Sequence, residues 1–374
     1  MAVLSYARTA RPLERELDLG ALERNHARLH AHLPAGTLVL ASVKANAYGH
    51  GVVAVARRLE ELGVAGVATA SVGDALAVRE AGISCRVALF GGQLPGALAE
   101  LATSAITPSV ANRESAVALA AAGSRAGVFV EIDGGLGRTG LAGAETEQVI
   151  REILLPAGMA VEGVYTHLPF TDAEGERWAR AGLRRFDATL ERLRQGGFEP
   201  PLAQALSSPG VSAGLDSAAN AVCVGRILYG LAPQVGSAAQ WGLEPVFAAL
   251  RTRIVHVGSH AAGARVASGG RYQLRAPSRT AVVPFGRSDG YLPAPAAEAV
   301  MIHRGRRVGV IGASLEHTTL DLADGGAEVG EEVVVLGRGQ GCEVTLAELA
   351  SWFGVDPLDA LVMLDAPRLA ASPA

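Results

Sequence analysis

A single lysine, Lys44, stands in the stretch ASVKANAYGHG at residues 41–51, directly after a short apolar run. In an apolar setting the pKa of a lysine amine falls, so the uncharged amine can attack a carbonyl carbon. Tyr48 and the turn through Gly49 and Gly51 follow closely and could reach a phosphate group. The alternative is a lysine that pairs with a carboxylate at the rim of a sheet. Judged by position alone, this second interpretation is the stronger.

Other chemistry-bearing patterns have weaker support. GLGRTG at residues 135–140 fits the G-x-G-x-x-G pattern of dinucleotide-binding turns, but the nearest suitable acid, Glu162, precedes a predicted strand instead of following one. His26 and His30 are one helical turn apart, yet no carboxylate or cysteine completes a site, so a solvated helix face is favoured and no metal is predicted. For His317, an acid–base role and an ordinary surface position are equally supported interpretations.

The elements that must position Lys44 alternate between strands and helices from about residue 37 to residue 235. Short apolar runs read as strands buried on both faces, and helical patterns separate them. Such alternation predicts a parallel sheet, and about eight units fit the span, the number that closes a (β/α)8 TIM barrel. Periodicity does not show closure, so an open doubly wound sheet stays possible. The runs include TLVLASVK, GVAGVATA, CRVALFG, AITPSV, GVFVEID, VEGVYTH and PLAQALSS.

After about residue 240 the sequence changes to β-rich runs between glycine, proline and charged turns, such as RTRIVHVG, SRTAVVPFG, RRVGVIGAS and EEVVVLG. We therefore expect a barrel domain over residues 12–240 and a mainly β C-terminal domain over residues 241–374, joined by an N-terminal strand within about residues 1–11. On this α/β architecture Lys44 ends the first barrel strand, at the carboxyl-terminal rim where active sites of such barrels lie.

Composition limits the function classes. The chain has 374 residues, of which 49% are hydrophobic and 19% charged, so it can bury a large core. Its formal net charge of -4 gives no attraction to nucleic acid or anionic membranes. Three scattered cysteines favour a reducing compartment, and we recognise neither a signal-peptide pattern nor an apolar run of membrane length. We expect a cytoplasmic protein without nucleic-acid or membrane partners.

The string VKANAYGHG closely resembles the cofactor-lysine motif of the alanine racemases, fold-type III enzymes that use pyridoxal 5′-phosphate (PLP). The resemblance covers nearly the whole chain, through RELDLGALERNHARL, EIDGGLGRTGL, EGVYTHL and PFGRSDGY. It implies a (β/α)8 barrel followed by a β domain, in agreement with the pattern of elements. It also implies an amino-acid substrate and a homodimer in which each active site is completed by the partner subunit's β domain.

The resemblance assigns roles to individual residues. Lys44 falls on the catalytic lysine that holds PLP covalently, and Tyr48 falls on a tyrosine that binds the PLP phosphate. Arg138 falls on the arginine that hydrogen-bonds the phenolic oxygen of PLP, and His167 on the histidine beside the pyridine ring. Many family members place a carbamylated lysine before that arginine. Glu131 stands there instead, and we hypothesise that its charge pairs with Arg138.

The phosphate end of the cofactor is assigned in the same way. Ser207 and Gly225 fall on a phosphate-binding serine and glycine, and the backbone N–H of Arg226 could also meet the phosphate. Cys223 stands where the family has an arginine that faces the pyridine nitrogen.

Several further positions depart from the family pattern. Ser268 takes the place of the tyrosine that is the family's second catalytic base. Arg287 replaces a tyrosine of the GYADGY motif, which keeps Asp289, and Ala370 stands where the C-terminal tyrosine is expected. Glu316 replaces an aspartate near the family's substrate site. A serine hydroxyl is a far poorer proton acceptor than a perturbed phenol unless another base activates it.

These departures leave the reaction open. Racemisation needs proton removal on one face of Cα and delivery on the other, and a positioned acid or base contributes about 10²–10⁴-fold. We therefore expect a PLP enzyme that acts at the Cα of an amino acid, as an atypical racemase or epimerase or in aldol-type carbon–carbon bond chemistry, such as an aldolase, transaldolase or hydroxymethyltransferase. Decarboxylation stays open as well. The alternatives are a PLP-binding carrier or regulator with little catalysis and an NAD-dependent barrel enzyme.

Overall fold

The computed structural model describes residues 2–3, 12–101, 104–123, 127–294, 298–323 and 325–365, and omits the side chains of residues 2, 3, 99 and 100. The chain forms two compact units. The barrel unit comprises Ala21–Ala47 and Gly51–Glu244, and the β unit comprises Met1–Gly20, Tyr48–His50 and Pro245–Ala374.

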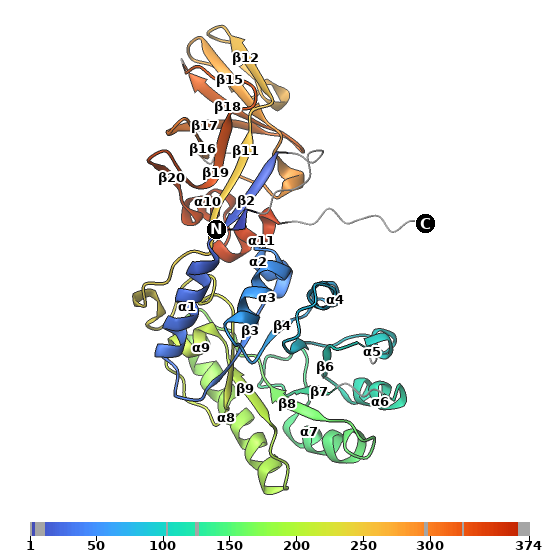
Figure 1. Cartoon of the computed structure of the whole chain (residues 1–374). Coiled ribbons are helices and arrows are strands. Elements are labelled where there is room, and N and C mark those ends of the chain that lie inside the picture. The colour runs from blue at the N-terminus through green and yellow to red at the C-terminus, as the bar shows by residue number, and fades with distance from the viewer. Residues whose placement is uncertain are drawn as a thin grey trace. The chain divides into compact units, whose positions relative to one another are not determined.

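The barrel unit contains a closed barrel of parallel strands in the order β10-β3-β4-β5-β6-β7-β8-β9 (Figure 1). Closure, which periodicity left open, comes from β10, because β10 pairs with both β3 and β9. The predicted TIM barrel is confirmed, although the short β10 is not among the runs recognised in the sequence. The strands are β3 (Leu38–Ser42), β4 (Gly66–Thr69), β5 (Val87–Leu89), β6 (Thr107–Val110), β7 (Val128–Glu131), β8 (Val161–Tyr165), β9 (Leu202–Leu206) and β10 (Ala221–Val224).

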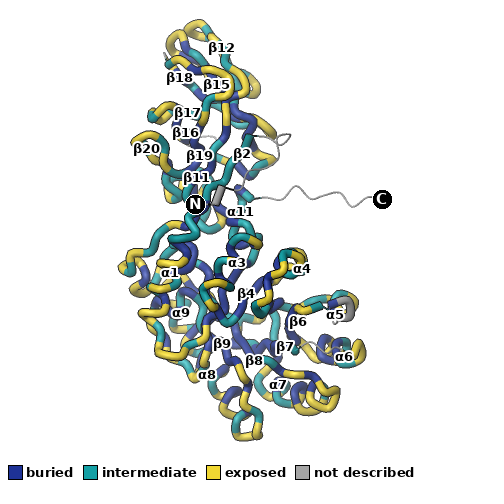
Figure 2. The backbone as a smooth tube through the Cα atoms, viewed as in Figure 1, coloured by how far each residue is buried: buried dark blue, intermediate teal, exposed yellow. Residues whose placement is uncertain are grey.

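The barrel strands are buried on both faces, as their uniform apolar composition predicts. Every residue of β4, β5, β6 and β7 is buried. Figure 2 shows β4 in dark blue, the colour of buried residues. Residues from seven strands form an apolar layer inside the barrel: Leu40, Ala68, Ala88, Phe129, Tyr165, Leu202 and Ala221.

Helices cover the outside of the barrel, and capping residues explain where several of them begin. The side chains of Ser71, Asn112 and Asp172 each accept a backbone N–H at the start of α4, α6 and α8. The arginine-rich helix α8 (Ala173–Gln195) buries an apolar stripe, as an outer barrel helix should. The elements are α1 (Leu19–Ala31), α2 (Lys44–Tyr48), α3 (Val52–Glu61), α4 (Val72–Glu80), α5 (Pro95–Leu101), α6 (Arg113–Ala121), α7 (Gly143–Val149), the π-helix η1 (Ile150–Leu154), α8 (Ala173–Gln195), α9 (Ser208–Ser212) and η2 (Ala238–Gln240).

The β unit is built on an antiparallel sheet in the order β1-β2-β11-β19-β16-β17-β18-β15-β12, with β20 beside β19. Residues 12–20, which we expected to open the barrel domain, belong to this unit because β2 pairs with β11. The strands are β1 (Ala2–Val3), β2 (Leu13–Leu17), β11 (Phe247–Arg253), β12 (His256–His260), β15 (Ser278–Val283), β16 (Val300–His303), β17 (Arg306–Ala313), β18 (Thr318–Ala323), β19 (Glu332–Gly339) and β20 (Cys342–Val344).

Smaller elements complete the β unit. β13 (Arg265–Val266) and β14 (Tyr272–Gln273) pair with each other in a separate two-stranded ribbon. Single turns of 3-10 helix, η3 (Ser268–Gly270) and η4 (Arg287–Asp289), lie in loops, and α10 (Leu346–Phe353) and α11 (Pro357–Leu364) follow the last strand.

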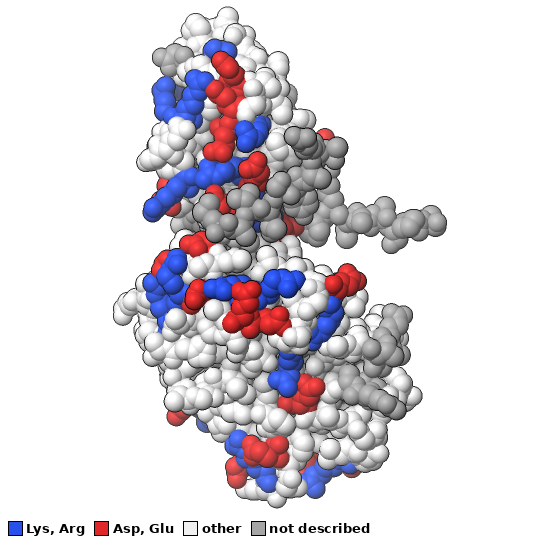
Figure 3. Space-filling model, in the orientation of Figure 1, with Lys and Arg blue, Asp and Glu red and all other residues white. Residues whose placement is uncertain are grey.

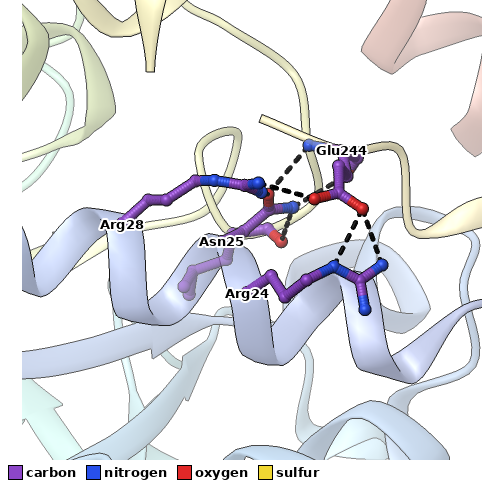
Figure 4. Close-up of polar contacts among 5 residues, drawn as sticks. Arg24, Asn25, Arg28 and Glu244 are labelled. Carbon is purple, nitrogen blue, oxygen red and sulfur yellow. Dashed lines mark hydrogen bonds and ion pairs between the residues drawn. The ribbon is translucent and has the colours of Figure 1, made fainter. Parts of the chain in front are cut away.

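The end of the barrel unit is fixed by a polar cluster on α1, which we call the Glu244 clamp (Figure 4). The Asn25 amide donates to the carbonyls of Leu228 and Glu244, at 3.1 and 2.7 Å, and its carbonyl accepts the Glu244 N–H at 2.9 Å. Arg24 and Arg28 each bind one carboxylate oxygen of Glu244 at 2.6 Å, and these bonds lower the pKa of Glu244 to about 2.

Surface charges of both signs are interleaved on the face shown in Figure 3. Several of them form ion pairs, such as Arg58 with Glu23 and Glu61 at 2.5 and 2.7 Å. No helix within the described residues is long and apolar enough to span a membrane.

Candidate active site

Most of the predicted cofactor residues lie where barrel strands end, which is where barrel active sites are built. The strands end at neighbouring positions around the closed barrel, so the loops that follow them share one rim. The residues on this rim are Lys44 after β3, Arg138 after β7, His167 after β8, Ser207 after β9, Cys223 within β10, and Gly225 and Arg226 after it.

Charge interactions show that four of these side chains are near one another. Burial lowers the pKa of Lys44, the charge of Arg138 lowers it further, and Cys223 partly opposes both effects. Burial lowers the pKa of His167 to about 3, with further lowering by Lys44 and Arg138. Burial also raises the pKa of Cys223 to about 11. At neutral pH the imidazole and the thiol are therefore uncharged, and the lysine amine loses its proton more readily than in water.

Barrel closure brings Cys223 to Lys44. Cys223 pairs with Leu40 across the β10–β3 seam, four residues before Lys44. The positive charge of Lys44 acts on the pKa of Cys223 in the lowering direction, against the larger effect of burial.

The backbone turn that follows Lys44 is left-handed. Ala45, Asn46 and Ala47 have φ/ψ of 51/58°, 52/47° and 55/48°, and Tyr48 has φ of 53°. For residues other than glycine this conformation costs about 1–2 kcal/mol each, because Cβ approaches the following carbonyl oxygen. A run of such residues persists only where the surroundings hold it.

Glu131 is buried at the end of β7 and bonds to the arginine loop through its neighbour. The Thr139 hydroxyl donates to a Glu131 carboxylate oxygen at 2.9 Å. Burial raises the pKa of Glu131, while hydrogen bonds from Thr139 and Tyr165 and the charge of Arg138 lower it. Among the described ion pairs none joins Glu131 to Arg138, so the hypothesised direct pair is replaced by a bond to Thr139 and a longer-range attraction.

Two adjacent serines after β9 have different surroundings. The Ser207 hydroxyl is buried and has no hydrogen-bond partner among the described residues. The Ser208 hydroxyl accepts the N–H groups of Gly225 and Ile227, at 3.2 and 3.5 Å. Sequence reasoning missed Ser208, since the pattern SS offers two candidates and only the structure shows which hydroxyl contacts the β10 loop.

The remaining predicted residues belong to the β unit. Ser268 is exposed and begins η3, next to Ala267, whose φ of 62° and ψ of 175° are unusual for a residue with a side chain. Glu316 is exposed in the loop between β17 and β18. Tyr48 is half-buried and groups with this unit by its contacts. Ala370 lies outside the described residues.

The weaker sequence patterns have structural explanations. The Asp133 carboxylate accepts the N–H groups of Gly135 and Gly137, at 2.8 and 3.2 Å, and so shapes the GLGRTG turn as the loop that carries Arg138. His26 and His30 lie on α1 with their Nε2 atoms 3.1 Å apart. In the part of the chain that is described, no group of three or more metal-ligating side chains comes together.

Known proteins resemble the chain along nearly its whole length. Two family models match it, "Alanine racemase, N-terminal domain" over residues 17–233 and "Alanine racemase, C-terminal domain" over residues 247–370. The chain belongs to the alanine racemase family. A curated alanine racemase of Symbiobacterium thermophilum is 33% identical over 346 residues, 91% of each chain. One of Streptococcus pneumoniae serotype 19F is 31% identical over 348 residues, 91% of this chain and 93% of the relative.

Solved alanine racemase structures have the same fold. The alanine racemase of Clostridium difficile 630 superposes with a TM-score of 0.87 at 25% identity, over 95% of this chain and 94% of that one. The enzyme from a D-cycloserine producing Streptomyces lavendulae gives a TM-score of 0.83 at 28% identity, over 96% of both chains.

Alanine racemases are PLP-dependent isomerases, and this family member is a PLP enzyme. The rim residues fit the cofactor. A lysine with a lowered pKa suits covalent attachment to its aldehyde, and the buried Ser207 hydroxyl offers a hydrogen bond that a phosphate can accept. Bound PLP withdraws electrons from the bonds at the Cα of an amino acid.

Proposed function

We propose that the chain transfers protons at the Cα of an amino acid, as a racemase or epimerase whose second proton-transfer group differs from the family's tyrosine. The observation that carries this proposal is the lowered pKa of Lys44 on a rim where His167 and Cys223 stay neutral. An amine with a lowered pKa releases its proton more readily than an ordinary lysine, which suits a group that accepts and returns a proton.

Each rim residue has a proposed part. Lys44 holds the cofactor and carries the proton on one face of Cα, and Arg138 binds the phenolic oxygen. His167 supplies an uncharged ring. The hydroxyl of Ser207 and the backbone N–H groups of Gly225 and Arg226, together with Tyr48, bind the phosphate. Cys223 places a neutral thiol where relatives have a fixed positive charge.

For the second face we propose Ser268, with Glu316 near the substrate, both supplied by the partner subunit in a homodimer. Ser268 is exposed, and a strained Ala267 precedes it, which is common at functional positions. A cytoplasmic location is part of the same proposal.

Aldol-type carbon–carbon bond chemistry is a second candidate. It is favoured by Ser268, because a serine leaves space beside Cα that a tyrosine would fill. A PLP-binding carrier with little catalysis would use the same rim residues.

Amino acids incubated with the holoenzyme in deuterated water test these possibilities. Loss of the Cα–H signal together with appearance of the opposite enantiomer or epimer supports the proposed racemase or epimerase. Release of an aldehyde supports the aldol-type reaction instead, and no exchange with any amino acid supports a carrier. Lys44→Ala should abolish both exchange and covalent cofactor attachment, whereas an NAD-dependent enzyme would tolerate this change.

A further inference from the structure

The left-handed turn after Lys44 is closed by its own backbone bonds. The Ala47 N–H donates to the Val43 carbonyl at 2.9 Å, so that Lys44 lies inside the turn. The Gly51 N–H donates to the Asn46 carbonyl at 2.9 Å. Alanine and asparagine also form right-handed turns with bonds of this kind, at lower energy. Backbone bonds alone therefore do not explain why this turn is left-handed.

Asn46 connects the turn to two helices. Its side-chain oxygen accepts the N–H of Val52, the first residue of α3, at 2.7 Å. Its backbone N–H, which lies inside the left-handed turn, donates to a carboxylate oxygen of Asp74 at 3.1 Å. Both bonds are made while the turn is left-handed.

Asp74 is itself held firmly in the first turn of α4. The Ser71 hydroxyl caps α4 by accepting the Asp74 N–H at 3.1 Å. The Thr69 hydroxyl, at the end of β4, donates to the same Asp74 oxygen at 3.2 Å and accepts the Ser71 N–H at 3.1 Å. The end of β4, the barrel strand next to β3, thus fixes the Asp74 carboxylate beside the turn.

We propose that Asp74 is a positioning residue for Lys44. Its carboxylate holds the Asn46 N–H, which keeps the turn left-handed and aims the Lys44 amine toward the rim. Without this acceptor the bond that holds the Asn46 N–H to α4 is lost, and the backbone gains from relaxing toward the right-handed form that its residues prefer. This inference rests on the proposed role of Lys44 in holding the cofactor, and it assigns Asp74 no contact with cofactor or substrate.

The test measures the rate at which cofactor-free protein forms its covalent lysine adduct after PLP is added. The visible absorbance of the adduct reports this rate. We expect Asp74→Ala to slow this step about tenfold, the effect of losing one charge-assisted hydrogen bond. Asp74→Asn, which keeps an oxygen acceptor, should stay within about threefold of the wild type. Glu114→Ala is the matched control, since Glu114 is the acid in the first turn of α6.

A rescue variant separates positioning through the turn from other effects of Asp74. Glycine adopts the left-handed conformation without penalty, so Ala45→Gly should restore most of the lost rate in the Asp74→Ala background. The thermal midpoint of the cofactor-free protein should fall further in Asp74→Ala than in Glu114→Ala, because Asp74 accepts hydrogen bonds from Asn46 and Thr69, and Ala45→Gly should restore the rate whether or not it restores this midpoint.

The outcomes are distinguishable. If wild-type protein forms no adduct, the proposed function of Lys44 fails. If it does, and Asp74→Ala reacts as fast as Glu114→Ala, only the positioning role is wrong. If Ala45→Gly does not restore the rate in the Asp74→Ala background, that result also contradicts the positioning role of Asp74. If Asp74→Ala does not fold, Thr69→Val replaces it, because it removes the hydroxyl that orients Asp74 at nearly constant volume. It should slow the step about threefold, and an unchanged rate overturns the inference.

Discussion

At the scale of single residues, burial shifts the pKa of several side chains on the active-site rim toward their uncharged forms. Burial keeps the His167 imidazole and the Cys223 thiol neutral, and it favours the free amine of Lys44. If Cys223 takes the place of the family's arginine as proposed, its neutral thiol removes a fixed positive charge from this group. We expect the stability of the protein, as well as its chemistry, to depend on these protonation states.

The buried His167 makes stability fall as the pH falls. Its pKa is about 3 in the folded chain and about 6.5 when unfolded, so the unfolded chain binds the proton first. The stabilisation is complete above about pH 6.5 and is lost as the pH falls toward 3. Between pH 7 and pH 5, urea denaturation of cofactor-free wild type should lose up to about 2 kcal/mol that His167→Gln does not lose. Exposed His256→Gln is the control, and equal slopes for all three proteins would contradict the prediction.

Glu131 supports function at the expense of stability. Because burial raises its pKa, an ionised Glu131 is unfavourable in the folded chain above its unfolded pKa. Glu131→Gln keeps an acceptor for Thr139 and should stabilise the cofactor-free protein at pH 8. It should weaken PLP binding about tenfold, because Arg138 loses the nearby negative charge. Thr139→Val removes the hydrogen bond but keeps the charge of Glu131, so it separates the effect of the bond from that of the charge. Unchanged cofactor affinity and turnover in Glu131→Gln would contradict the proposed role of this charge.

The chemistry-bearing residues could be predicted from the sequence, but their supporting neighbours could not. Lys44, Arg138 and His167 stand in long motifs at the ends of recognisable strands, so their placement on one rim follows from the barrel. Ser208 and Asp74 carry no distinctive pattern, and their roles depend on which backbone N–H each one reaches.

At the scale of elements, short loops after the strands hold the site, and the Ser208 bonds join two of them. The hydroxyl at the start of α9 accepts N–H groups from the segment after β10. These bonds fix the spacing between the predicted phosphate-binding residues Ser207 and Gly225.

Removal of the Ser208 hydroxyl should loosen this pairing. We expect Ser208→Ala to raise the dissociation constant for PLP about five- to tenfold, because two backbone N–H groups lose their acceptor. Equilibrium titration of cofactor-free protein measures the effect. Ser212→Ala, on the same helix, removes a hydroxyl that donates to the Val235 carbonyl and should leave the affinity unchanged. Equal affinities for the two variants would contradict the prediction.

Two elements could not be predicted from local sequence. The α2 turn is left-handed although its alanines favour the right-handed form, so contacts from α3 and α4 override the local preference. β10, with the residues AVCV, is no shorter than β4, β6 or β7, but it is not among the apolar runs recognised in the sequence. The other barrel strands lie within apolar runs that the sequence shows clearly.

At the scale of the whole molecule, the change in sequence pattern near residue 240 predicted two units. The Glu244 clamp lies where the barrel unit ends. Asn25 is buried and uses both ends of its amide, while Arg24 and Arg28 bind the Glu244 carboxylate. The clamp joins α1 to a residue 219 positions later, and no local pattern predicts such a contact.

Asn25 should matter more to stability than the charged pairs around it. Asn25→Ala leaves the Leu228 and Glu244 backbone groups without their partner, and should lower the free energy of unfolding by about 2–3 kcal/mol. Arg24→Ala removes an exposed ion pair and should cost less than about 1 kcal/mol. Urea denaturation of both variants checks the order, and a larger loss for Arg24→Ala would contradict it.

The seam between β3 and β10 also sets when the active site can first exist during synthesis. Lys44 leaves the ribosome early, but its neighbour Cys223 is made roughly 180 residues later, about ten to forty seconds at ordinary translation rates. Until then the barrel is open, and Lys44 lacks the burial that lowers its pKa. The nascent chain therefore carries a lysine with an ordinary pKa, and the free amine becomes more available only when the last strand closes the ring.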